Sequence, residues 1–155
     1  MTKQLCLIFD LDGTFFNVKH REHHVAGSDY KEADFHKFYE AMDNDIPHPW
    51  ALRMLQLYFA ADYKIFFVTG RPANYRDRTM TSLEKHTLLK PYQYELYMRD
   101  ADDYDTKDTV LKEKHYRDSI EPRYEVDFVV EDRNRVVDHW RKIGLVCLQC
   151  YPGDF

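Results

Sequence analysis

The chain has 155 residues, of which 44% are hydrophobic and 15% aromatic, and such a chain can bury one substantial core. This composition excludes an intrinsically disordered chain, although 32% of the residues are charged. The formal net charge of -5 excludes a global attraction for polyanions, so any contact with phosphate or nucleic acid must come from a local basic cluster. We therefore predict a single domain over residues 1–155.

Five short apolar runs have the length and the abrupt polar ends that are typical of buried parallel strands. The first run ends in an acidic turn that contains Gly13. The run at 94–98 has the weakest pattern of the five. The runs cover residues 5–9, 64–68, 94–98, 126–130 and 145–148.

Helical patterns separate these runs. The first helix is begun by Pro47 or Pro49, and the second is capped by Thr106 or Asp105 and runs to about residue 119. The third helix stops at Gly144. The apolar faces expected of the first and third helices are Trp50, Met54, Leu57, Tyr58 and Ala61, and Val136, Val137, Trp140 and Ile143.

The alternation of apolar strands with amphipathic helices predicts an α/β fold of three layers, in which helices cover both faces of a central parallel sheet. Functional groups in such a sheet gather at the carboxyl ends of the strands. Residues 17–46, rich in His, Asp, Glu and Tyr, depart from this alternation and are far longer than a usual loop. We interpret them as a small cap insertion after the first strand, helical from Glu32 to Met42.

Two pairs of acidic residues follow apolar runs. Asp10 and Asp12 end the first run, where one carboxylate can attack phosphorus and the other can protonate the leaving oxygen and later activate water. Glu131 and Asp132 end the run at 126–130 and offer the oxygen ligands that Mg²⁺ prefers. Because a phosphate dianion is repelled by carboxylates, this chemistry requires a cation, and we expect Mg²⁺ as the cofactor.

Phosphate-binding groups follow two other elements. Thr69 ends the run at 64–68 and, with the neighbouring Gly70, offers a hydroxyl and backbone N–H groups to phosphate oxygens. Lys107, near the start of the second helix, can neutralise the transferring phosphoryl group. The sequence therefore predicts an acidic site with added positive charge at the strand ends.

The segments D-L-D-G-T, V-T-G-R, D-T-K-D and V-E-D-R stand in the order typical of the haloacid dehalogenase (HAD) superfamily of phosphatases, which the chain resembles. It is further similar to the C-terminal 3′-phosphatase half of phage polynucleotide kinase-phosphatase, down to V-V-D-H-W-R-K-I-G-L and a terminal G-D-F. This resemblance covers 4–15 and 45–155 and is loose at 22–44. It implies a HAD-like Rossmannoid fold, Mg²⁺ and a phospho-aspartyl intermediate.

The resemblance also implies roles for single residues. Asp10 corresponds to the nucleophile, and Asp12 to the general acid/base, whose backbone carbonyl also binds the metal. Thr69 and Lys107 complete the catalytic set. The metal ligands are Asp10 and the acidic pair at 131–132.

Two arginines, Arg21 and Arg71, match arginines of the polynucleotide phosphatases, where a guanidinium can grip phosphate bidentately. Gly70 and Asp105 are further candidates for the phosphate site. The D-T-K-D segment is one residue shorter than the form typical of the family, which leaves Lys112 as a rival to Lys107.

Glu131 stands where the family usually has aspartate, and its side chain is one methylene longer. Asp132 is therefore favoured as the direct metal ligand. The cap insertion is longer than that of the phage enzymes and borders the substrate entrance, so the resemblance transfers substrate choice less well than chemistry.

Three other groups of residues have weaker functional interpretations. His20, His23 and His24 lack the H-x-x-x-H spacing of a helical metal site, so surface exposure is favoured. Basic residues at 76–85 suit a nucleic-acid groove but are more often a solvated helix face. The Tyr and Phe residues at 30–39 suit base stacking, although packing of the cap is favoured.

The N-terminal sequence lacks the features of a secretory signal, and the chain has no run of about 18 apolar residues. A cytoplasmic location and no membrane partner are therefore expected. The three cysteines are an odd number, which favours reduced thiols. Cys147 and Cys150 form a C-x-x-C pair, but positions three apart on a strand face opposite sides, which disfavours a redox or zinc site.

The leading functional hypothesis is hydrolysis of terminal 3′-phosphates on DNA or RNA ends during repair. The enzymatic alternative is a small-molecule phosphatase, such as one that acts on nucleoside monophosphates. A catalytically silent binding module is disfavoured by the intact set of candidate catalytic residues. Because the sequence contains no G-x-x-x-x-G-K-[ST] phosphate loop, we expect a phosphatase without a kinase domain.

Overall fold

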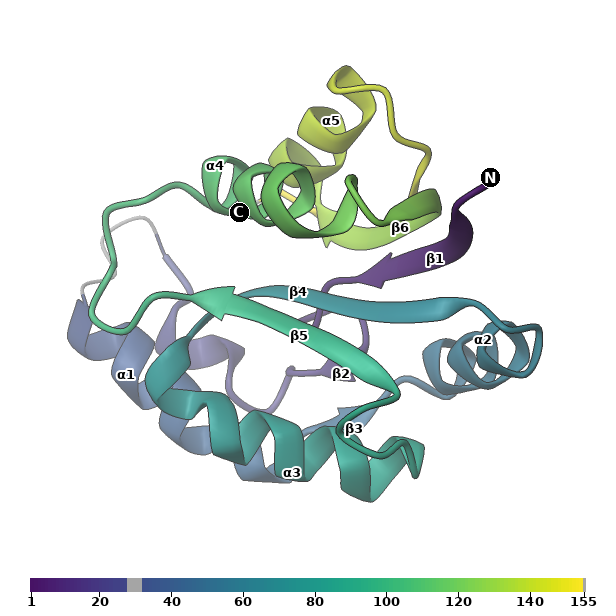
Figure 1. Ribbon diagram of the computed structural model, residues 1–155. Helices are drawn as coiled ribbons and strands as arrows, with labels where there is room; N and C mark the ends of the chain where they lie inside the picture. Colours follow the sequence, from purple (N-terminus) through teal and green to yellow (C-terminus); the bar gives the residue numbers. More distant parts are fainter. Residues whose placement is uncertain (28–31, 155) are drawn as a thin grey trace.

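The computed structural model describes residues 1–27 and 32–154. Five parallel strands form a sheet in the order β5-β4-β1-β6-β7, and helices cover both of its faces (Figure 1). The predicted three-layer α/β fold is confirmed. The strands are β1 (Gln4–Phe9), β4 (Lys64–Pro72), β5 (Tyr94–Arg99), β6 (Tyr124–Arg133) and β7 (Cys147–Gly153).

The central strand β1 is buried on both faces. Its side chains alternate, with Leu7 and Phe9 in the core on one side of the sheet and Cys6 and Ile8 in the core on the other. All four are at most 1% exposed because each face carries a helical layer. This double burial explains why the strand appears in the sequence as a continuous apolar run.

Two helices cover each face of the sheet. Helices α2 (Pro49–Ala60) and α3 (Arg76–Thr87) lie on one side, and α4 (Asp108–His115) and α5 (Asn134–Lys142) on the other (Figure 1). Pro49 lies in the first turn of α2, and Gly144 follows α5 with a φ of 97°, as expected for a helix stop. Short segments precede α3 and follow α4: η3 (Ala73–Tyr75) and the π turn η4 (Tyr116–Ile120).

The predicted apolar face of α2 is confirmed in part, because Trp50, Met54 and Tyr58 pack against the core. The helix buries Ala51 and Leu55, whereas Leu57 is 71% exposed. This segment is apolar almost all round, so spacing alone does not select a face. The small side chain of Ala51 lies fully buried in the core, which brings this side of the helix against the sheet.

Strand β7 begins two residues later than predicted and extends to Gly153. Cys147 lies in the core beneath α5, whereas Cys150 packs against the core on the opposite face. Both thiols are free, as is that of Cys6. The pair therefore points to opposite faces of the sheet, as the strand spacing predicts.

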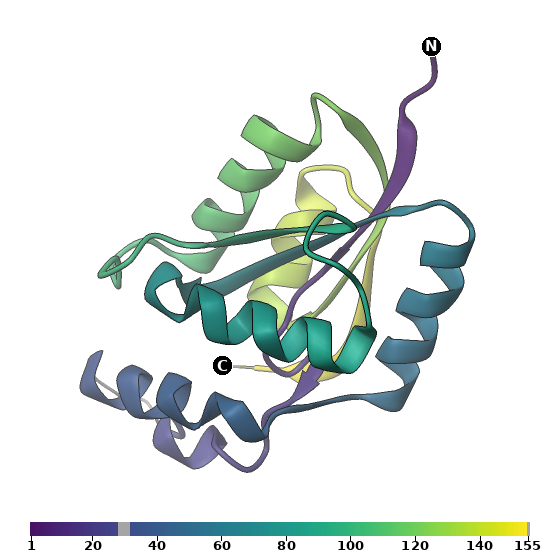
Figure 2. The same cartoon turned by 60° about the horizontal axis from the view of Figure 1, so that its bottom comes forward.

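The insertion after β1 forms a cap. Strands β2 (Phe16–Asn17) and β3 (Ile46–Pro47) pair antiparallel at its base. The elements between them are η1 (Glu22–His24), α1 (Glu32–Glu40) and η2 (Ala41–Asn44). Phe38, Tyr39 and Met42 join the core on the side of α2 and α3, so the cap continues that core. Figure 2 shows the cap and the end of β7 at the same end of the sheet.

Aromatic residues from 30–39 and a basic residue from 76–85 contact residues of the cap. Phe38 and Tyr39 pack in the cap core, as favoured, whereas Tyr30 lies outside the described residues. In the basic stretch, Arg78 binds Glu40 and Asp43 of the cap, with Arg78 Nη1 lying 2.9 Å from Glu40 Oε2. Arg78 therefore links α3 to the cap.

Candidate active site

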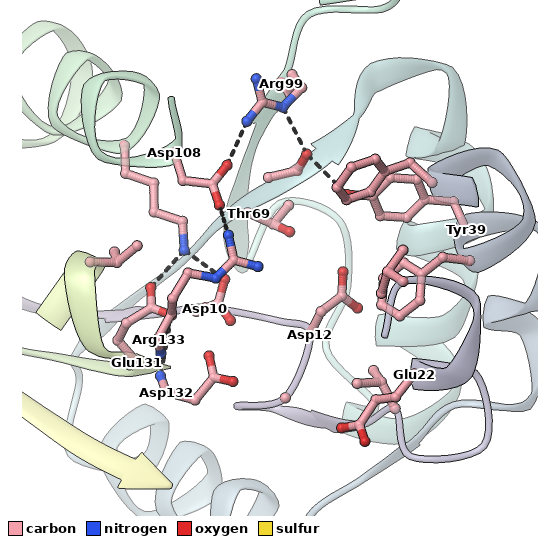
Figure 3. Close-up of a pocket in the computed structure, with 18 of the residues that line it drawn as sticks. Asp10, Asp12, Glu22, Tyr39, Thr69, Arg99, Asp108, Glu131, Asp132 and Arg133 are labelled. Atoms are coloured by element: carbon pink, nitrogen blue, oxygen red, sulfur yellow. Dashed lines mark hydrogen bonds and ion pairs between the residues drawn. The ribbon is translucent and has the colours of Figure 1, made fainter. Parts of the chain in front are cut away.

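The carboxyl ends of β1, β4 and β6 meet at a pocket of about 820 Å³. Its walls include Asp10 and Asp12 after β1, Thr69 and Gly70 of β4, and the acidic pair at 131–132 of β6 (Figure 3). These residues are far apart in sequence, and the parallel sheet brings them together because its strands share one direction. The cap supplies part of the opposite wall, including Tyr39.

The turn after β1 fixes the two aspartates. The N–H of Asp10 donates to the carbonyl of Val130 at 3.0 Å, which ties the end of β1 to β6. Gly13 then has a φ of 83°, and a Cβ at this position would collide with the carboxylate of Asp132. Glycine is therefore required here both for the turn and for the space beside the acidic pair.

Asp10, Glu131 and Asp132 form a buried acidic cluster in which one oxygen of each lies within 4.8 Å of the others. Burial and then the charge of Glu131 raise the pKa of Asp10 to about 7. Burial also raises the pKa of Glu131 to about 7, against the charge of Lys112, and that of Asp132 to about 6, helped by Asp10. Carboxylates that are so crowded and so poorly hydrated suit a divalent cation with hard oxygen ligands. The acidic cluster can therefore hold such an ion.

Lys112 already supplies one positive charge to this cluster. Its Nζ lies 2.7 Å from Asp10 Oδ1 and 2.6 Å from Glu131 Oε2, and the lysine is only 4% exposed. Burial alone would lower the pKa of Lys112, but the two carboxylates outweigh it and raise the pKa above its ordinary value. The ammonium therefore stays charged beside Asp10.

Two predicted residues, Lys107 and Asp105, lie elsewhere. Lys107 is the exposed N-cap of α4, and Asp105 is exposed in the preceding turn. The carboxylate of Asp103 accepts the N–H groups of residues 105 and 106, which delays the start of the helix until Asp108. Neither Lys107 nor Asp105 lines the pocket, whereas Lys112 and Asp108 do, so the geometry favours Lys112 over Lys107.

The spacing of Asp108 and Lys112 explains why they act together. Residues four apart on an α-helix share a face, and this face of α4 turns toward the pocket. The pattern Asp-x-x-x-Lys was visible in the sequence. It becomes informative only when the start of the helix is known.

Asp12 is held by the two predicted arginines. Arg21 Nη2 and Arg71 Nη2 each lie 2.5 Å from Asp12 Oδ1, and Arg71 Nε donates to the same carboxylate. Burial would raise the pKa of Asp12, but the charges of Arg71 and Arg21 outweigh it and hold the pKa well below its usual range. Both arginines are fully buried, so in this structure their partners are carboxylates rather than the open pocket.

Asp45, at the end of the cap, binds both of these arginines, and the sequence did not identify it as part of the site. Its carboxylate accepts from Arg21 Nε at 2.8 Å, from Arg21 Nη2 at 2.6 Å and from Arg71 Nη2 at 2.9 Å. Asp45 is 1% exposed, and His20 lies 2.9 Å from the same carboxylate. A second carboxylate therefore balances the second guanidinium in the buried cluster.

Arg99 and Arg133 also line the pocket, and sequence reasoning missed both. Asp108 bridges them, with Oδ1 lying 2.5 Å from Arg99 Nη2 and Oδ2 bound to Arg133 (Figure 3). Each arginine ends a strand, β5 and β6 respectively, which is the signal that could have found them. They give the pocket the local positive charge that the acidic chain lacks overall.

Thr69 and Gly70 form the pocket wall at β4. The hydroxyl of Thr69 accepts the N–H of Arg71 at 3.2 Å, which fixes the turn. The carbonyl of Gly70 accepts from Arg99 Nε at 3.1 Å and from the Tyr39 hydroxyl at 3.4 Å (Figure 3). The wall therefore connects the sheet to the cap.

The chain matches the family described as the polynucleotide kinase PNKP phosphatase domain over residues 4–155. It belongs to this family. Membership makes the chain a phosphoric monoester hydrolase of the HAD superfamily, as the ordered segments around Asp10 and Asp132 predict.

Solved structures agree with this family assignment. One is described as the structure of a Pnkp1/Rnl/Hen1 complex, with 31% identity and a TM-score of 0.80 over 100% of this chain and 48% of that chain. Another, of the Pnkp1/Rnl/Hen1 RNA repair complex, has 30% identity and a TM-score of 0.80 over 99% and 44% of the respective chains. The chain thus spans about half the length of these relatives.

A class C acid phosphatase from Bacillus anthracis shares the fold of this chain. Its identity is 16% and its TM-score 0.67, over 99% of this chain and 68% of that chain. Among the described residues, no helix has both the length and the apolar character needed to span a membrane.

Proposed function

We propose that this phosphatase removes 3′-phosphates from nucleic-acid ends during repair, through a covalent phospho-aspartyl intermediate on Asp10. The observation that carries the chemistry is the buried Asp10 carboxylate at the pocket, bonded to Lys112 and two residues from an arginine-bound Asp12. The substrate class is supported by the match to the polynucleotide kinase phosphatase domain and by the likeness to structures of an RNA repair complex.

The reaction has two steps on the same two aspartates. A carboxylate oxygen of Asp10 attacks phosphorus, the bond from phosphorus to the 3′ oxygen breaks, and Asp12 gives that oxygen a proton. Water then attacks the phosphorus, Asp12 takes the proton from the water, and the bond to Asp10 breaks. The products are a 3′-hydroxyl end, inorganic phosphate and the regenerated aspartates.

Asp12 needs a proton to act as the acid, although the two arginines favour its charged form. A phosphate dianion in the pocket brings like charge close to Asp12, which raises the pKa of that carboxylate. The dianion also attracts Arg21 and Arg71 and weakens their hold on Asp12. Substrate binding thus prepares the proton donor, while the free enzyme keeps Asp12 ionised.

The acidic cluster is the proposed Mg²⁺ site, with Asp10 and Asp132 as side-chain ligands and the backbone carbonyl of Asp12 as a third. When bound, Mg²⁺ would neutralise charge on the phosphate and on Asp10. Glu131 stabilises the site through hydrogen bonds to its neighbours. Its Oε2 accepts from Lys112 at 2.6 Å and its Oε1 accepts the N–H of Asp132 at 3.2 Å, so both oxygens are already engaged.

We further propose that residues 1–155 act as one HAD-like domain with 17–46 as its cap. A cytoplasmic location fits the free thiols of all three cysteines, which an oxidising compartment would expose to disulfide exchange. The longer cap borders the pocket and is the part of the chain that sets which phosphomonoester enters.

The test compares phosphate release, with Mg²⁺, from a 3′-phosphorylated single-stranded oligonucleotide, its 5′-phosphorylated isomer and a nucleoside 3′-monophosphate. We expect the highest kcat/KM for the 3′-phosphorylated oligonucleotide. A strong preference for the mononucleotide would overturn the polynucleotide assignment in favour of a small-molecule phosphatase. Asp10→Asn serves as the chemical control: unchanged phosphate release would show that Asp10 is not the nucleophile.

A further inference from the structure

Three aromatic rings gather on the surface beside the pocket: those of His48, Trp50 and Tyr151. The His48 and Trp50 rings are stacked with centroids 6.1 Å apart and planes 20° from parallel, and the Tyr151 ring lies 5.0 Å from that of His48. Trp50 Nε1 donates to the Tyr151 hydroxyl at 3.1 Å, and that hydroxyl lies 3.4 Å from His48 Nδ1. We call these three residues the aromatic platform.

The aromatic platform is only partly covered by the protein. Tyr151 is 40% exposed, and His48 and Trp50 are half-buried. The hydrogen bonds hold the rings to one another, so little side-chain freedom is lost when a flat ligand covers them. Trp50 also packs against the core, but none of the three residues has a part in the proposed chemistry.

The aromatic platform adjoins the turn that follows β1. The N–H of His48 donates to the carbonyl of Phe15 at 2.8 Å, and Phe15 follows the D-L-D-G-T segment. On the other side, Cys150 precedes Tyr151 and its Sγ lies 3.8 Å from the hydroxyl of Thr14. Pro152, the residue after Tyr151, lines the pocket itself. The aromatic platform is thus joined through Tyr151 to the pocket wall at Pro152.

Two positive features lie near the aromatic platform, the start of α2 and Lys19. Trp50 lies in the first turn of α2, whose N-terminal N–H groups carry the positive end of the helix dipole. Burial and the nearby charge of Lys19 lower the pKa of His48, so its ring is neutral at pH 7 and stacks as a flat aromatic surface. Lys19 and the start of α2 then remain for the phosphate that links two nucleotides.

We propose that the aromatic platform stacks a base of single-stranded nucleic acid, upstream of the nucleotide whose 3′-phosphate enters the pocket. The proposal rests on the polynucleotide substrate proposed above. Stacking of bases on aromatic rings tolerates any sequence, which suits an enzyme that processes ends of every sequence. It also explains how a pocket built for phosphate would favour a chain over a mononucleotide.

The first experiment measures the preference for chain over mononucleotide in variants of the aromatic platform. The ratio of KM values for a nucleoside 3′-monophosphate and a 3′-phosphorylated oligonucleotide should fall roughly tenfold in Trp50→Ala, because one stacked base is lost. Trp50→Phe should restore most of the ratio. Tyr151→Ala offers an independent variant on an edge strand, and Leu57→Ala, an exposed apolar site on the same helix, should leave the ratio unchanged.

The second experiment follows tryptophan fluorescence directly. The chain has two tryptophans, and Trp140 is 1% exposed, so quenching by an added base reports on Trp50. An Asp10→Asn variant, which cannot turn over, is titrated with the 3′-phosphorylated oligonucleotide. We expect quenching that is absent from the Asp10→Asn, Trp50→Phe double variant.

These outcomes separate the aromatic platform from the proposed function. If wild type prefers the oligonucleotide but neither the KM ratio nor the fluorescence depends on Trp50, the platform is overturned and the function stands. The platform is likewise overturned if Trp50→Ala and Leu57→Ala change the ratio equally. If wild type does not act on 3′-phosphorylated oligonucleotides, the proposed function fails, and the platform assignment falls with it.

Discussion

At the scale of single residues, Lys112 is the buried cation of the acidic cluster. Its ammonium pairs with both Asp10 and Glu131, so Lys112→Met leaves two crowded carboxylates without their charge partner. We expect kcat to fall by on the order of 100-fold, the effect of losing one preorganised charge near a transferring phosphoryl group. Steady-state kinetics at saturating Mg²⁺ measures this loss.

Lys107→Met is the matched control, because it removes the same side chain from the exposed start of the same helix. Its kcat should stay within about twofold of wild type, as surface substitutions generally do. Equal losses in the two variants would restore Lys107 to the catalytic role that the sequence predicts.

Asp45 balances the charge of two buried arginines. Asp45→Asn keeps the shape of the side chain but leaves Arg21 and Arg71 with Asp12 as their remaining carboxylate partner. Breaking a buried ion pair costs about 3–5 kcal/mol of unfolding free energy, and here the remaining amide oxygen recovers part of it. We expect a loss of ~2 kcal/mol in urea unfolding.

The control for Asp45→Asn lies two residues away. Asp43 pairs with Arg78 at the surface and its side chain is 69% exposed, so Asp43→Asn should cost less than about 0.5 kcal/mol. A similar cost for both substitutions would mean that Asp45 contributes no more than a surface ion pair does.

At the scale of secondary-structure elements, β7 packs so closely on the end of β6 that Gly153 has no room for a side chain. A Cβ there would lie 2.5 Å from the carbonyl oxygen of Asp132 and 2.8 Å from the Cα of Arg133. Backbone atoms cannot rotate away, so Gly153→Ala must push the strands apart and shift Asp132. We expect a loss of about 1–3 kcal/mol in stability and weaker activation by Mg²⁺, measured by urea unfolding and Mg²⁺ titration of activity.

Gly144→Ala separates strain from displacement. Gly144 has a φ of 97°, and a Cβ added at this position would meet no atom within 4 Å. Alanine there therefore costs about 1 kcal/mol of stability without moving a strand. Its Mg²⁺ titration should match that of wild type. A Gly153→Ala enzyme with the same Mg²⁺ dependence would contradict the link between β7 and the acidic cluster.

The elements also show where sequence reasoning succeeds. The strands were predictable because double burial produces continuous apolar runs, and the start of α2 because proline suits a first helical turn. The start of α4 was not, because the side chain of Asp103 decides it by accepting two backbone N–H groups. That shift changed which lysine and which aspartate face the pocket.

At the scale of the whole molecule, burial of the acidic cluster links stability to pH and to Mg²⁺. The pKa values of Asp10 and Glu131 are raised to about 7 and that of Asp132 to about 6. In a metal-free protein, carboxyl groups with raised pKa values add stability that is complete below pH ~4 and is lost as the pH rises through about 6 to 7. Mg²⁺ bound at the proposed site would replace these protons, so it should stabilise the protein most above that range.

We therefore expect the increase in Tm caused by Mg²⁺ to be small at pH 5 and to reach roughly 5 °C at pH 8. Differential scanning fluorimetry with and without Mg²⁺ measures it. Asp132→Asn, which removes a proposed ligand, should lose most of this increase. An increase that is independent of pH would place Mg²⁺ binding away from the acidic cluster.

The sequence by itself determined the layered fold and the acidic strand ends, because each depends on residues that are neighbours in the chain. Only the tertiary structure decided that Lys112 reaches Asp10, that Asp45 balances Arg21 and Arg71, and that Arg99 and Arg133 line the pocket. These pairings join residues up to 102 positions apart. Charge compensation in a buried site depends on which groups lie next to one another in the fold, and the spacing of residues along the chain does not indicate this.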